Sequence, residues 1–476
     1  MPDKKRTKLV ATLGPASSKR EVLKKMMIEG VDVFRINFSH ADYNDVKNKI
    51  KIIRELGVEL KTNIAILADL QGPKLRIGLM QDGVEIEVGD ILNFCTGEEF
   101  EGTKNRVYMN YNNFPKDVTP GEQILVDDGK LIFEVIESNG DSEVKVKVVQ
   151  GGELHSRKGV NLPNTKISLP ALTKKDKEDA IFAIGQEVDW LALSFVRNAE
   201  DLKELQALIE AHSEYKIPII AKIEKPEAVK NLDKIIPFCD GLMVARGDLG
   251  VEVPAEEVPL IQKELVLKAK WARIPVIIAT QMMETMISSL TPTRAEVNDV
   301  ANSVMDGADA VMLSGETSVG DYPVDVIKKM ATILRKVENS SLITVPQEPP
   351  TIRTNRYITK AICYHAAHMA NEIEAKAICT LTNSGYTAFQ ISSWRPTAYI
   401  LVFTSNKRIL SRLNLLWGVK SFYYDKFVST NETVVDVNKI AFDKDFVKKD
   451  DFIINLAAMP IVDKGMVNTL RVSQVK

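Results

Sequence analysis

Residues 219–224 read Ile-Ile-Ala-Lys-Ile-Glu, and residues 241–248 read Gly-Leu-Met-Val-Ala-Arg-Gly-Asp. Both runs are mostly apolar and end in charged residues. Short apolar runs are typical of parallel strands that are buried on both faces. The reacting groups of a (β/α)8 barrel lie at the carboxyl ends of its strands. The two endings therefore favour a barrel with a polar site at one mouth.

Six more apolar runs flank this pair, and amphipathic helical stretches separate them. The patterns Ser18-x-x-Glu21 and Thr173-x-x-Asp176 predict helix starts with side-chain capping. This alternation predicts an α/β fold of the (β/α)8, or TIM-barrel, type. An open doubly wound sheet shares the local pattern, but the polar strand ends favour the closed barrel. The expected strands are 8–14, 33–39, 64–70, 190–196, 219–224, 241–248, 276–281 and 310–316.

Two further domains interrupt or follow the barrel. Between residues 73 and 169 the apolar pattern changes to period two, as in 131–135 and 144–148, which predicts an inserted antiparallel β domain. Its position after the third strand places it over the barrel mouth as a lid. A Pro-containing linker then leads to a C-terminal α/β domain. The expected boundaries are 1–72 with 170–343 for the barrel, 73–169 for the lid and 344–476 for the C-terminal domain.

The composition excludes several functional classes. There are 62 Lys+Arg and 64 Asp+Glu, so no global field attracts nucleic acid or anionic lipid. The four cysteines are far apart and show no disulfide framework, as expected of reduced thiols. No leader or membrane-length apolar run is visible. We therefore expect a cytoplasmic protein that binds neither nucleic acid nor membranes.

The strand ends carry residues suited to phosphate chemistry. Glu224 and Asp248 offer hard carboxylate oxygens, which Mg²⁺ prefers when it binds together with a phosphorylated substrate. Lys222 lies on the same strand face as Glu224, where it could stabilise an enolate or a transferring phosphoryl group. Arg35 adds a guanidinium that can donate two hydrogen bonds to a phosphate group. Taken singly, each is more often a solvated or salt-bridged residue, but their recurrence on several strand ends favours a site.

At these positions the sequence resembles the pyruvate kinase family. The likeness is collinear from about residue 7 to 335 and weaker towards the C-terminus. It implies Mg²⁺-dependent phosphoryl transfer from phosphoenolpyruvate to ADP, with Mn²⁺ as an alternative metal. The matching stretches are 12–17, 35–40, 69–73, 158–163, 222–224, 243–250, 279–283, 292–296 and 313–317.

The resemblance assigns a role to each candidate site residue. Glu224 and Asp248 would bind the metal, and Lys222 would stabilise the transferred group and the enolate. Backbone near Gly247 and the Thr280 hydroxyl would hold the substrate carboxylate. The residues expected to bind phosphate or to guide protonation of enolpyruvate are Arg35, Thr280, Ser314 and Glu316. The residues expected to approach the nucleotide are Asn37, His40, Arg76 and Lys158.

The first hinge of the lid departs from the family pattern. Residues 70–74 read Leu-Gln-Gly-Pro-Lys where Thr-Lys-Gly-Pro-Glu is usual. Members with Glu generally require K⁺, and its site would involve Asn37, Ser39, Asp69 and Leu70. The ammonium of Lys74 could replace that ion, so we expect K⁺ not to be required. Alternatively, Lys74 is a solvated hinge residue.

The C-terminal domain contains a loop that resembles the family's effector phosphate loop. Its candidate residues are Thr382, Asn383, Ser384, Gly385 and Thr387. Tyr386 stands where a basic residue is common, and residues 463–468 lack the usual Gly/Ser/Thr-rich segment. An ordinary strand-helix turn is therefore an equal alternative to a phosphorylated-metabolite site. Residues 293–296 resemble the family's subunit contact and suggest a homotetramer.

Two other functions fit part of this pattern. A metal-dependent lyase or aldolase that acts through pyruvate enolate could use Lys222, Glu224 and Asp248. The lid and Thr280 favour the kinase instead. Lys222 could also be a Schiff-base nucleophile, but adjacent carboxylates should keep it charged. A metabolite-binding regulator on a degenerate barrel would require damaged catalytic positions, and the sequence contains none.

Overall fold

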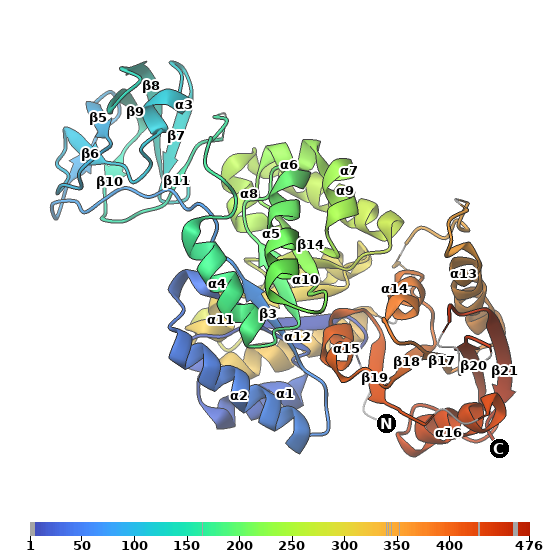
Figure 1. The fold of residues 1–476 in the computed structure, drawn as a ribbon. Coiled ribbons are helices and arrows are strands. Elements are labelled where there is room, and N and C mark those ends of the chain that lie inside the picture. The colour runs from blue at the N-terminus through green and yellow to red at the C-terminus, as the bar shows by residue number, and fades with distance from the viewer. Residues whose placement is uncertain are drawn as a thin grey trace.

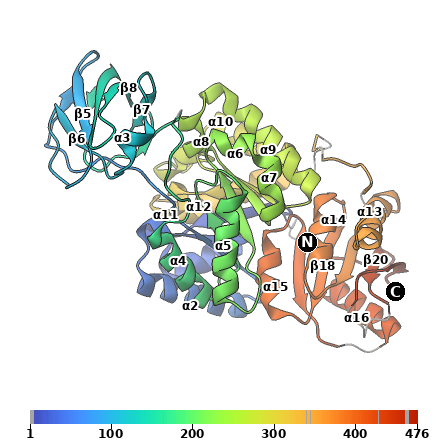
Figure 2. The same cartoon turned by 45° about the horizontal axis from the view of Figure 1, so that its top comes forward.

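The computed structural model describes residues 5–163, 165–338, 340, 342–343, 345–351, 353–426, 429–459 and 465–476. A central barrel carries the inserted β domain on one side and the C-terminal domain on the other (Figure 1). We call the inserted part the lid domain. Turning the molecule shows the same separation of lid and C-terminal domain (Figure 2).

Eight parallel strands close the barrel in the order β1-β2-β3-β12-β13-β14-β15-β16. All residues of most of these strands are buried, as expected when helices cover the outside and side chains fill the interior. The predicted fold class is confirmed. The strands are β1 (Lys8–Thr12), β2 (Val33–Asn37), β3 (Ala65–Asp69), β12 (Trp190–Leu193), β13 (Ile219–Ile223), β14 (Gly241–Ala245), β15 (Val276–Ala279) and β16 (Ala310–Leu313).

The outer helices begin close behind the strand ends. Expected strands 241–248 and 310–316 were too long, because helices start at Arg246 and Gly315. Thr173 forms the expected capping box with Asp176. The Ser18 cap was wrong: Lys19 is the N-cap, and the Ser18 hydroxyl donates to the carbonyl of Pro15. The helices are α1 (Arg20–Glu29), α2 (Tyr43–Glu59), α4 (Lys174–Gly185), α5 (Ala199–His212), α6 (Pro226–Lys230), α7 (Leu232–Ile235), α8 (Arg246–Glu252), α9 (Val258–Ala272), α10 (Arg294–Met305), α11 (Gly315–Ser318) and α12 (Pro323–Val337).

The lid domain is a largely antiparallel β structure with its own apolar core. Strands β8 and β9 have the expected alternation of buried and exposed residues, and their pairing has two register shifts. One neighbouring pair, β5 with β6, is parallel, so the sheet is mixed. The elements are β4 (Glu85–Ile86), β5 (Ile91–Cys95), β6 (Arg106–Tyr108), α3 (Phe114–Asp117), β7 (Gln123–Val126), β8 (Leu131–Ser138), β9 (Glu143–Gln150), β10 (Gly152–Glu153) and β11 (Val160–Asn161).

The C-terminal domain is a five-stranded sheet, β19-β18-β17-β20-β21, in which only the β20–β21 pairing is antiparallel. The expected α/β class is confirmed, whereas the domain boundaries stay a prediction. The elements are α13 (Tyr357–Glu372), β17 (Ala377–Leu381), α14 (Tyr386–Ser393), β18 (Tyr399–Thr404), α15 (Lys407–Arg412), β19 (Val419–Tyr423), α16 (Thr430–Asp443), β20 (Phe452–Ala457) and β21 (Thr469–Gln474).

Four aspartates stabilise the amino-terminal face of the barrel, opposite the candidate site. Each stands just before an even-numbered strand and accepts the backbone N–H of a residue on the preceding strand. We call these residues the aspartate ring. The pairs are Asp32 with Leu9 at 3.0 Å, Asp189 with Ile66 at 2.8 Å, Asp240 with Ile219 at 3.0 Å and Asp309 with Val276 at 2.8 Å.

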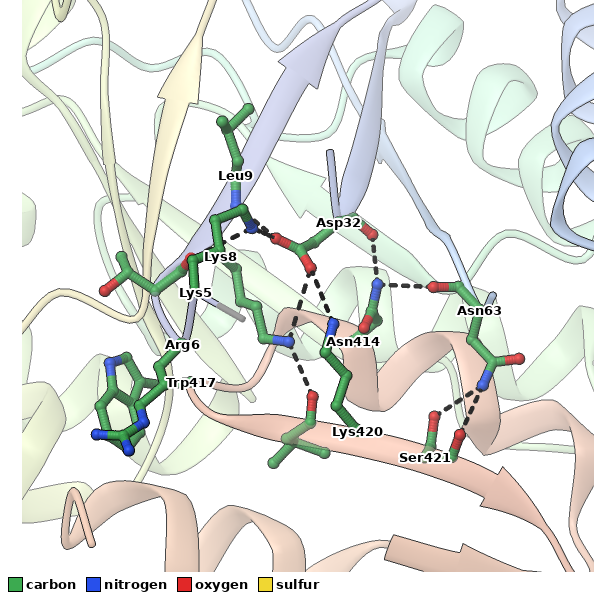
Figure 3. Close-up of polar contacts among 12 residues, drawn as sticks. Lys5, Arg6, Lys8, Leu9, Asp32, Asn63, Asn414, Trp417, Lys420 and Ser421 are labelled. Atoms are coloured by element: carbon green, nitrogen blue, oxygen red, sulfur yellow. Dashed lines mark hydrogen bonds and ion pairs between the residues drawn. The ribbon is translucent and has the colours of Figure 1, made fainter. Parts of the chain in front are cut away.

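The C-terminal domain docks on this face through Asp32 (Figure 3). Lys5 forms an ion pair with Asp32, and the Nζ atoms of Lys8 and Lys420 lie 3.7 and 3.8 Å from its Oδ1. Lys8 also donates to the carbonyl of Val419 at 2.9 Å. Asn414 donates to the backbone carbonyl of Asp32 at 2.9 Å. One buried carboxylate thus joins the two domains.

The free energy of unfolding should fall when the pH drops from about 4 to about 2. Burial alone raises the pKa of Asp32, but Lys5, Lys8 and Lys420 outweigh it and lower this pKa to about 2. Since this value lies below the ordinary 3.8, ionised Asp32 contributes about 2 kcal/mol above pH 3.8, which is lost as the pH falls through 2. Urea unfolding across this pH range should show that the free energy of unfolding depends less steeply on pH in Asp32→Asn than in the wild-type protein. The same pH dependence in both proteins would contradict the assignment of this effect to Asp32.

No helix among the described residues has the length and apolarity needed to cross a membrane. The four cysteines are buried and unpaired, as expected.

Candidate active site

Lys222 is the centre of a polar cluster at the carboxyl ends of the barrel strands. Its Nζ lies 3.1 Å from Oδ1 of Asp69 and 3.0 Å from Oε1 of Glu224, and it donates to the Ser194 hydroxyl at 2.6 Å. Lys222 is 8% exposed, so the cluster is shielded from bulk water. Three neighbouring strands, β3, β12 and β13, position these groups.

The surroundings of Lys222 keep it protonated. Burial lowers its pKa, but Asp69 and Glu224 outweigh burial, so the pKa lies above its ordinary value. A permanently charged ammonium can stabilise developing negative charge. It is a poor nucleophile, which argues against Schiff-base chemistry.

Glu224 and Asp248 form a donor set that fits a hard divalent cation. Glu224 is 1% exposed, and its Oε2 accepts the backbone N–H of Phe195 at 2.7 Å. Burial and the charge of Asp248 raise the pKa of Glu224, while Lys222 opposes them. The described residues contain no cluster of three or more metal-binding side chains. Two carboxylates leave positions for water and substrate, which is how Mg²⁺ usually binds with phosphorylated ligands.

Thr280 and Gly247 meet across the ends of β14 and β15. The backbone N–H of Gly247 donates to the Thr280 hydroxyl at 2.7 Å. Thr280 has φ of 71°, which is strained for a β-branched residue and is found mainly at functional sites. Arg246 stabilises this turn, because it donates to the Thr280 carbonyl at 2.8 Å and binds Asp299 with two hydrogen bonds of 2.6 and 2.7 Å.

Arg35 lies beside the same cluster. Its Nε donates to Oδ2 of Asp69 at 2.6 Å, and its Nη1 donates to the Thr12 hydroxyl at 3.1 Å. Asp69 thus binds both Arg35 and Lys222, and these cations hold its pKa below the ordinary value although burial alone would raise it. Two cations are aligned by one carboxylate.

Glu316 and Ser314 follow β16. Both carboxylate oxygens of Glu316 accept backbone N–H groups, from Met283 at 3.1 Å and from Ser314 at 2.7 Å. Burial raises the pKa of Glu316. Glu316 therefore joins the loop after β15 to the end of β16, and Ser314 is half-buried beside it.

The expected nucleotide residues divide between the barrel and the lid. Asn37 accepts the N–H of Ser39 at 3.2 Å in the barrel loop. In the lid, Arg76 donates to the carbonyl of Arg157 at 2.9 Å, and Lys158 pairs with Asp127 at 2.9 Å. The side chain of His40 lies outside the described part of the chain. Asn37 thus belongs to the barrel, and Arg76 and Lys158 to the lid, so a nucleotide that touches both groups would bridge lid and barrel.

The structure does not pair Lys74 with the proposed cation-site residues. Lys74 is exposed at the hinge and forms no ion pair with any described residue, whereas Asp69 and Leu70 are buried. Lys74 and Asp248 line one small cavity of about 40 Å³ between lid and barrel. Gly72 has φ of 70°, and a Cβ there would lie 2.8 Å from the Phe195 ring, so this hinge position requires glycine.

Several site residues were missed from the sequence. Ser194 directly follows β12, and it hydrogen bonds Lys222 and the carbonyl of Leu70 at 2.6 Å. The polar residues expected at the strand ends did not include one from β12. The same rule, that a polar residue after a barrel strand marks the site, could have found Ser194. Asn161 of the lid donates to Glu252 at 2.8 Å, and Glu252 pairs with Lys225 at 2.5 Å. No local pattern indicates that contact, because it joins distant segments.

The effector-type loop lies between β17 and α14. Gly385 has φ of 81°, and its N–H donates to the Thr382 hydroxyl at 3.0 Å. The Arg356 guanidinium lies over the Tyr386 ring, 4.3 Å from its centroid. The sequence had suggested that the loop lacks a cation, and the structure brings one from the segment before α13. Residues 460–464 of the neighbouring loop are outside the described residues.

Fold and site define a lidded (β/α)8-barrel protein with a cationic, carboxylate-bearing mouth suited to anionic substrates. Two family models match the chain: pyruvate kinase, barrel domain, over residues 4–327, and pyruvate kinase, alpha/beta domain, over residues 360–473. Pyruvate kinase 2 of Synechocystis sp. is 41% identical over 476 residues, with 99% of this chain and 80% of the relative covered. The pyruvate kinase of Corynebacterium efficiens is 42% identical, with 98% and 97% covered.

A solved structure leads to the same family. The crystal structure of a pyruvate kinase from Cryptosporidium parvum matches with a TM-score of 0.92 and 32% identity, covering 99% of this chain and 97% of that chain. The chain belongs to the pyruvate kinase family and is therefore a phosphotransferase of glycolytic type.

Proposed function

We propose that this protein transfers the phosphoryl group of phosphoenolpyruvate to ADP in the cytoplasm, with Mg²⁺ as the divalent ion. The observation that carries the proposal is the position of Lys222, buried between Asp69 and Glu224 at the barrel mouth. Family membership supports both substrates. The lyase and aldolase alternative is less favoured, because in this proposal Arg76 and Lys158 of the lid would contact a second, phosphate-bearing substrate.

In this proposal the chain's own residues position and stabilise anionic groups. Arg35 and Lys222 approach the transferring phosphoryl group together, because Asp69 holds both side chains. Such preorganised cations stabilise charge that develops in phosphoryl transfer. Lys222 then stabilises the enolate oxygen that remains.

Thr280 and Gly247 hold the substrate carboxylate, and Thr280 with Ser314 and Glu316 orients the proton donor for enolpyruvate. The backbone N–H contacts of Glu316 fix this loop. A divalent ion bound by Glu224 and Asp248 would supply Lewis-acid stabilisation of the substrate oxygens. The thermodynamic driving force comes from conversion of the enol to the ketone.

A coupled assay for pyruvate formation tests the function. Wild-type protein with phosphoenolpyruvate, ADP and Mg²⁺ should produce pyruvate, and Thr280→Met should lower kcat about 10²-fold, since it removes a positioned hydroxyl. Absence of pyruvate formation by the folded wild-type protein would overturn the proposal. A metabolite-binding regulator would give that result, but the candidate catalytic positions are intact.

We further propose that K⁺ is not required, because Lys74 supplies a positive charge at the hinge when the lid closes. Its position beside the cavity that Asp248 also lines supports this proposal. Wild-type turnover should be unchanged when tetramethylammonium replaces K⁺ and Na⁺. Lys74→Glu should become K⁺-activated, by about tenfold or more, because an anion replaces the cation. A many-fold activation of the wild-type protein by KCl would contradict the proposal.

Assembly as a homotetramer and regulation by a phosphorylated metabolite are also proposed. Leu260, Leu267 and Trp271 form an exposed apolar stripe on α9, which supports a subunit contact. The hydroxyl-bearing loop with Arg356 nearby supports an effector phosphate site at Thr382–Thr387. Light scattering and kinetics with sugar phosphates and AMP test these two proposals separately.

A further inference from the structure

A second cationic cavity lies at the opposite end of the barrel from the candidate active site. It has a volume of about 260 Å³ and lies between the barrel's amino-terminal face and α15 of the C-terminal domain. Arg54 of α2 and Asp189 of the aspartate ring line its barrel side. Figure 1 shows α15 against the lower part of the barrel, far from the lid.

The lining of this cavity carries excess positive charge. Four cationic side chains, Arg54, Lys407, Arg408 and Arg412, face two carboxylates, Glu187 and Asp189. Asp189 is already committed, because it accepts Arg54 Nη2 at 2.9 Å and the backbone N–H of Ile66 at 2.8 Å. The three cations of α15 form no ion pair with any carboxylate in the described ranges.

Arg412 has an unused hydrogen-bond donor inside the protein. Its Nη2 donates to the carbonyl of Lys216 at 2.7 Å, but its Nε is buried and has no partner among the described residues. Burial lowers the pKa of Arg412, which reflects the cost of placing this charge away from water. An unsatisfied buried donor on a cation indicates a missing anionic or water partner.

The remaining wall restricts the shape of a ligand. The Arg408 guanidinium lies over the Tyr215 ring, 3.7 Å from its centroid, so the ring fixes the plane of this donor fork. Guanidinium groups held in this way bind phosphate with paired hydrogen bonds. The volume of the cavity lies just below the usual range of small-molecule pockets, about 300–1,000 Å³, so it suits only a small metabolite.

We propose that this cavity binds a small phosphate monoester, whose phosphoryl group contacts Arg408 and Arg412. The ligand would link the barrel to the C-terminal domain, because its two walls come from Arg54 and Asp189 on one side and from α15 on the other. The site is separate from the Thr382–Thr387 loop, to which α15 connects through Asn406, whose Nδ2 donates to the carbonyl of Asn383 at 3.2 Å.

Calorimetric titration of the full-length protein in metal-free buffer tests the proposal, with glycerol 3-phosphate, orthophosphate and glycerol as probes. Glycerol 3-phosphate should bind saturably and glycerol should not. Arg408→Gln and Arg412→Gln should each weaken binding about tenfold or more, since each removes a charged donor. If Arg412→Gln fails to fold, Ser411→Asp should give the same loss by repulsion.

Arg106→Gln is the matched control, because this arginine also lies over an aromatic ring, that of Phe100, but stands on β6 of the lid domain. It should bind glycerol 3-phosphate as the wild-type protein does. An affinity in all α15 variants equal to that of the wild-type protein, an equal loss in Arg106→Gln, binding of orthophosphate only, or no saturable binding would each overturn the assignment. Turnover is not the readout, so failure here is distinguishable from failure of the proposed function.

Discussion

Replacing Lys222 with Met is expected to lower kcat for pyruvate formation by about 10³-fold, because the charge nearest the reacting oxygens is removed. The ammonium lies within 3.1 Å of Asp69 and Glu224, so its loss also leaves two buried carboxylates without their shared cation. Steady-state kinetics with both substrates should show the change in kcat. A change confined to KM would indicate that Lys222 binds the ground state and the transition state equally.

The Lys222→Met variant needs one control for correct folding and one for the loss of a positive charge as such. Lys203→Met removes an exposed lysine of α5 that pairs with Glu200 at 2.9 Å, and it should leave kcat unchanged. Circular dichroism and thermal melting should show that both variants are folded. Near-wild-type turnover by folded Lys222→Met would remove the central residue of the proposed mechanism.

Asp309→Asn is expected to destabilise the protein by about 3–5 kcal/mol, because it leaves buried cations without their counter-charge. Asp309 pairs with Lys270, which is 1% exposed, and its Oδ1 accepts Nη1 of Arg395 from the C-terminal domain at 2.9 Å. Its pKa lies below the ordinary value, since these two cations outweigh burial. Denaturant unfolding should measure the loss.

Asp240→Asn is a matched control within the aspartate ring. Asp240 also accepts a strand N–H, but its cation, Lys216, has a side chain that is 68% exposed. Water can solvate that ammonium when its partner is neutral, so the expected loss is only about 1 kcal/mol. Equal losses in both variants would show that the strand hydrogen bond, rather than the buried charge, dominates.

The barrel could be predicted from sequence because its signals are local and repeated. Each strand is a short apolar run, and most polar site residues lie at or just after the end of one, as Lys222 and Glu224 do for β13 and Asp248 does for β14. Strand ends were overestimated where polar residues that follow a strand already begin a helix, as at Arg246 and Asp248 of α8. The strand pairing of β14 ends at Ala245, so the polar residues behind it belong to the next helix.

Contacts between distant segments could not be read from the sequence. The partners of Ser194 and the Arg246–Asp299 pair depend on the closure of the barrel. Lys74 was expected either to replace a cation near Asp69 or to be a solvated hinge residue, and the structure places it exposed at the hinge. The aspartates that precede barrel strands β2, β12, β14 and β16 are present in the sequence, but their role follows only from the strand order.

The aspartate ring links the eight barrel strands in four neighbouring pairs. Asp189 closes the pair formed by β3 and β12, and these are the two strands between which the chain leaves the barrel to build the lid. The base of that pair is thus fastened by a carboxylate and Arg54, while its top holds the hinge. A change of angle at the hinge therefore does not require β3 and β12 to separate at their amino-terminal ends, on the face where the C-terminal domain docks.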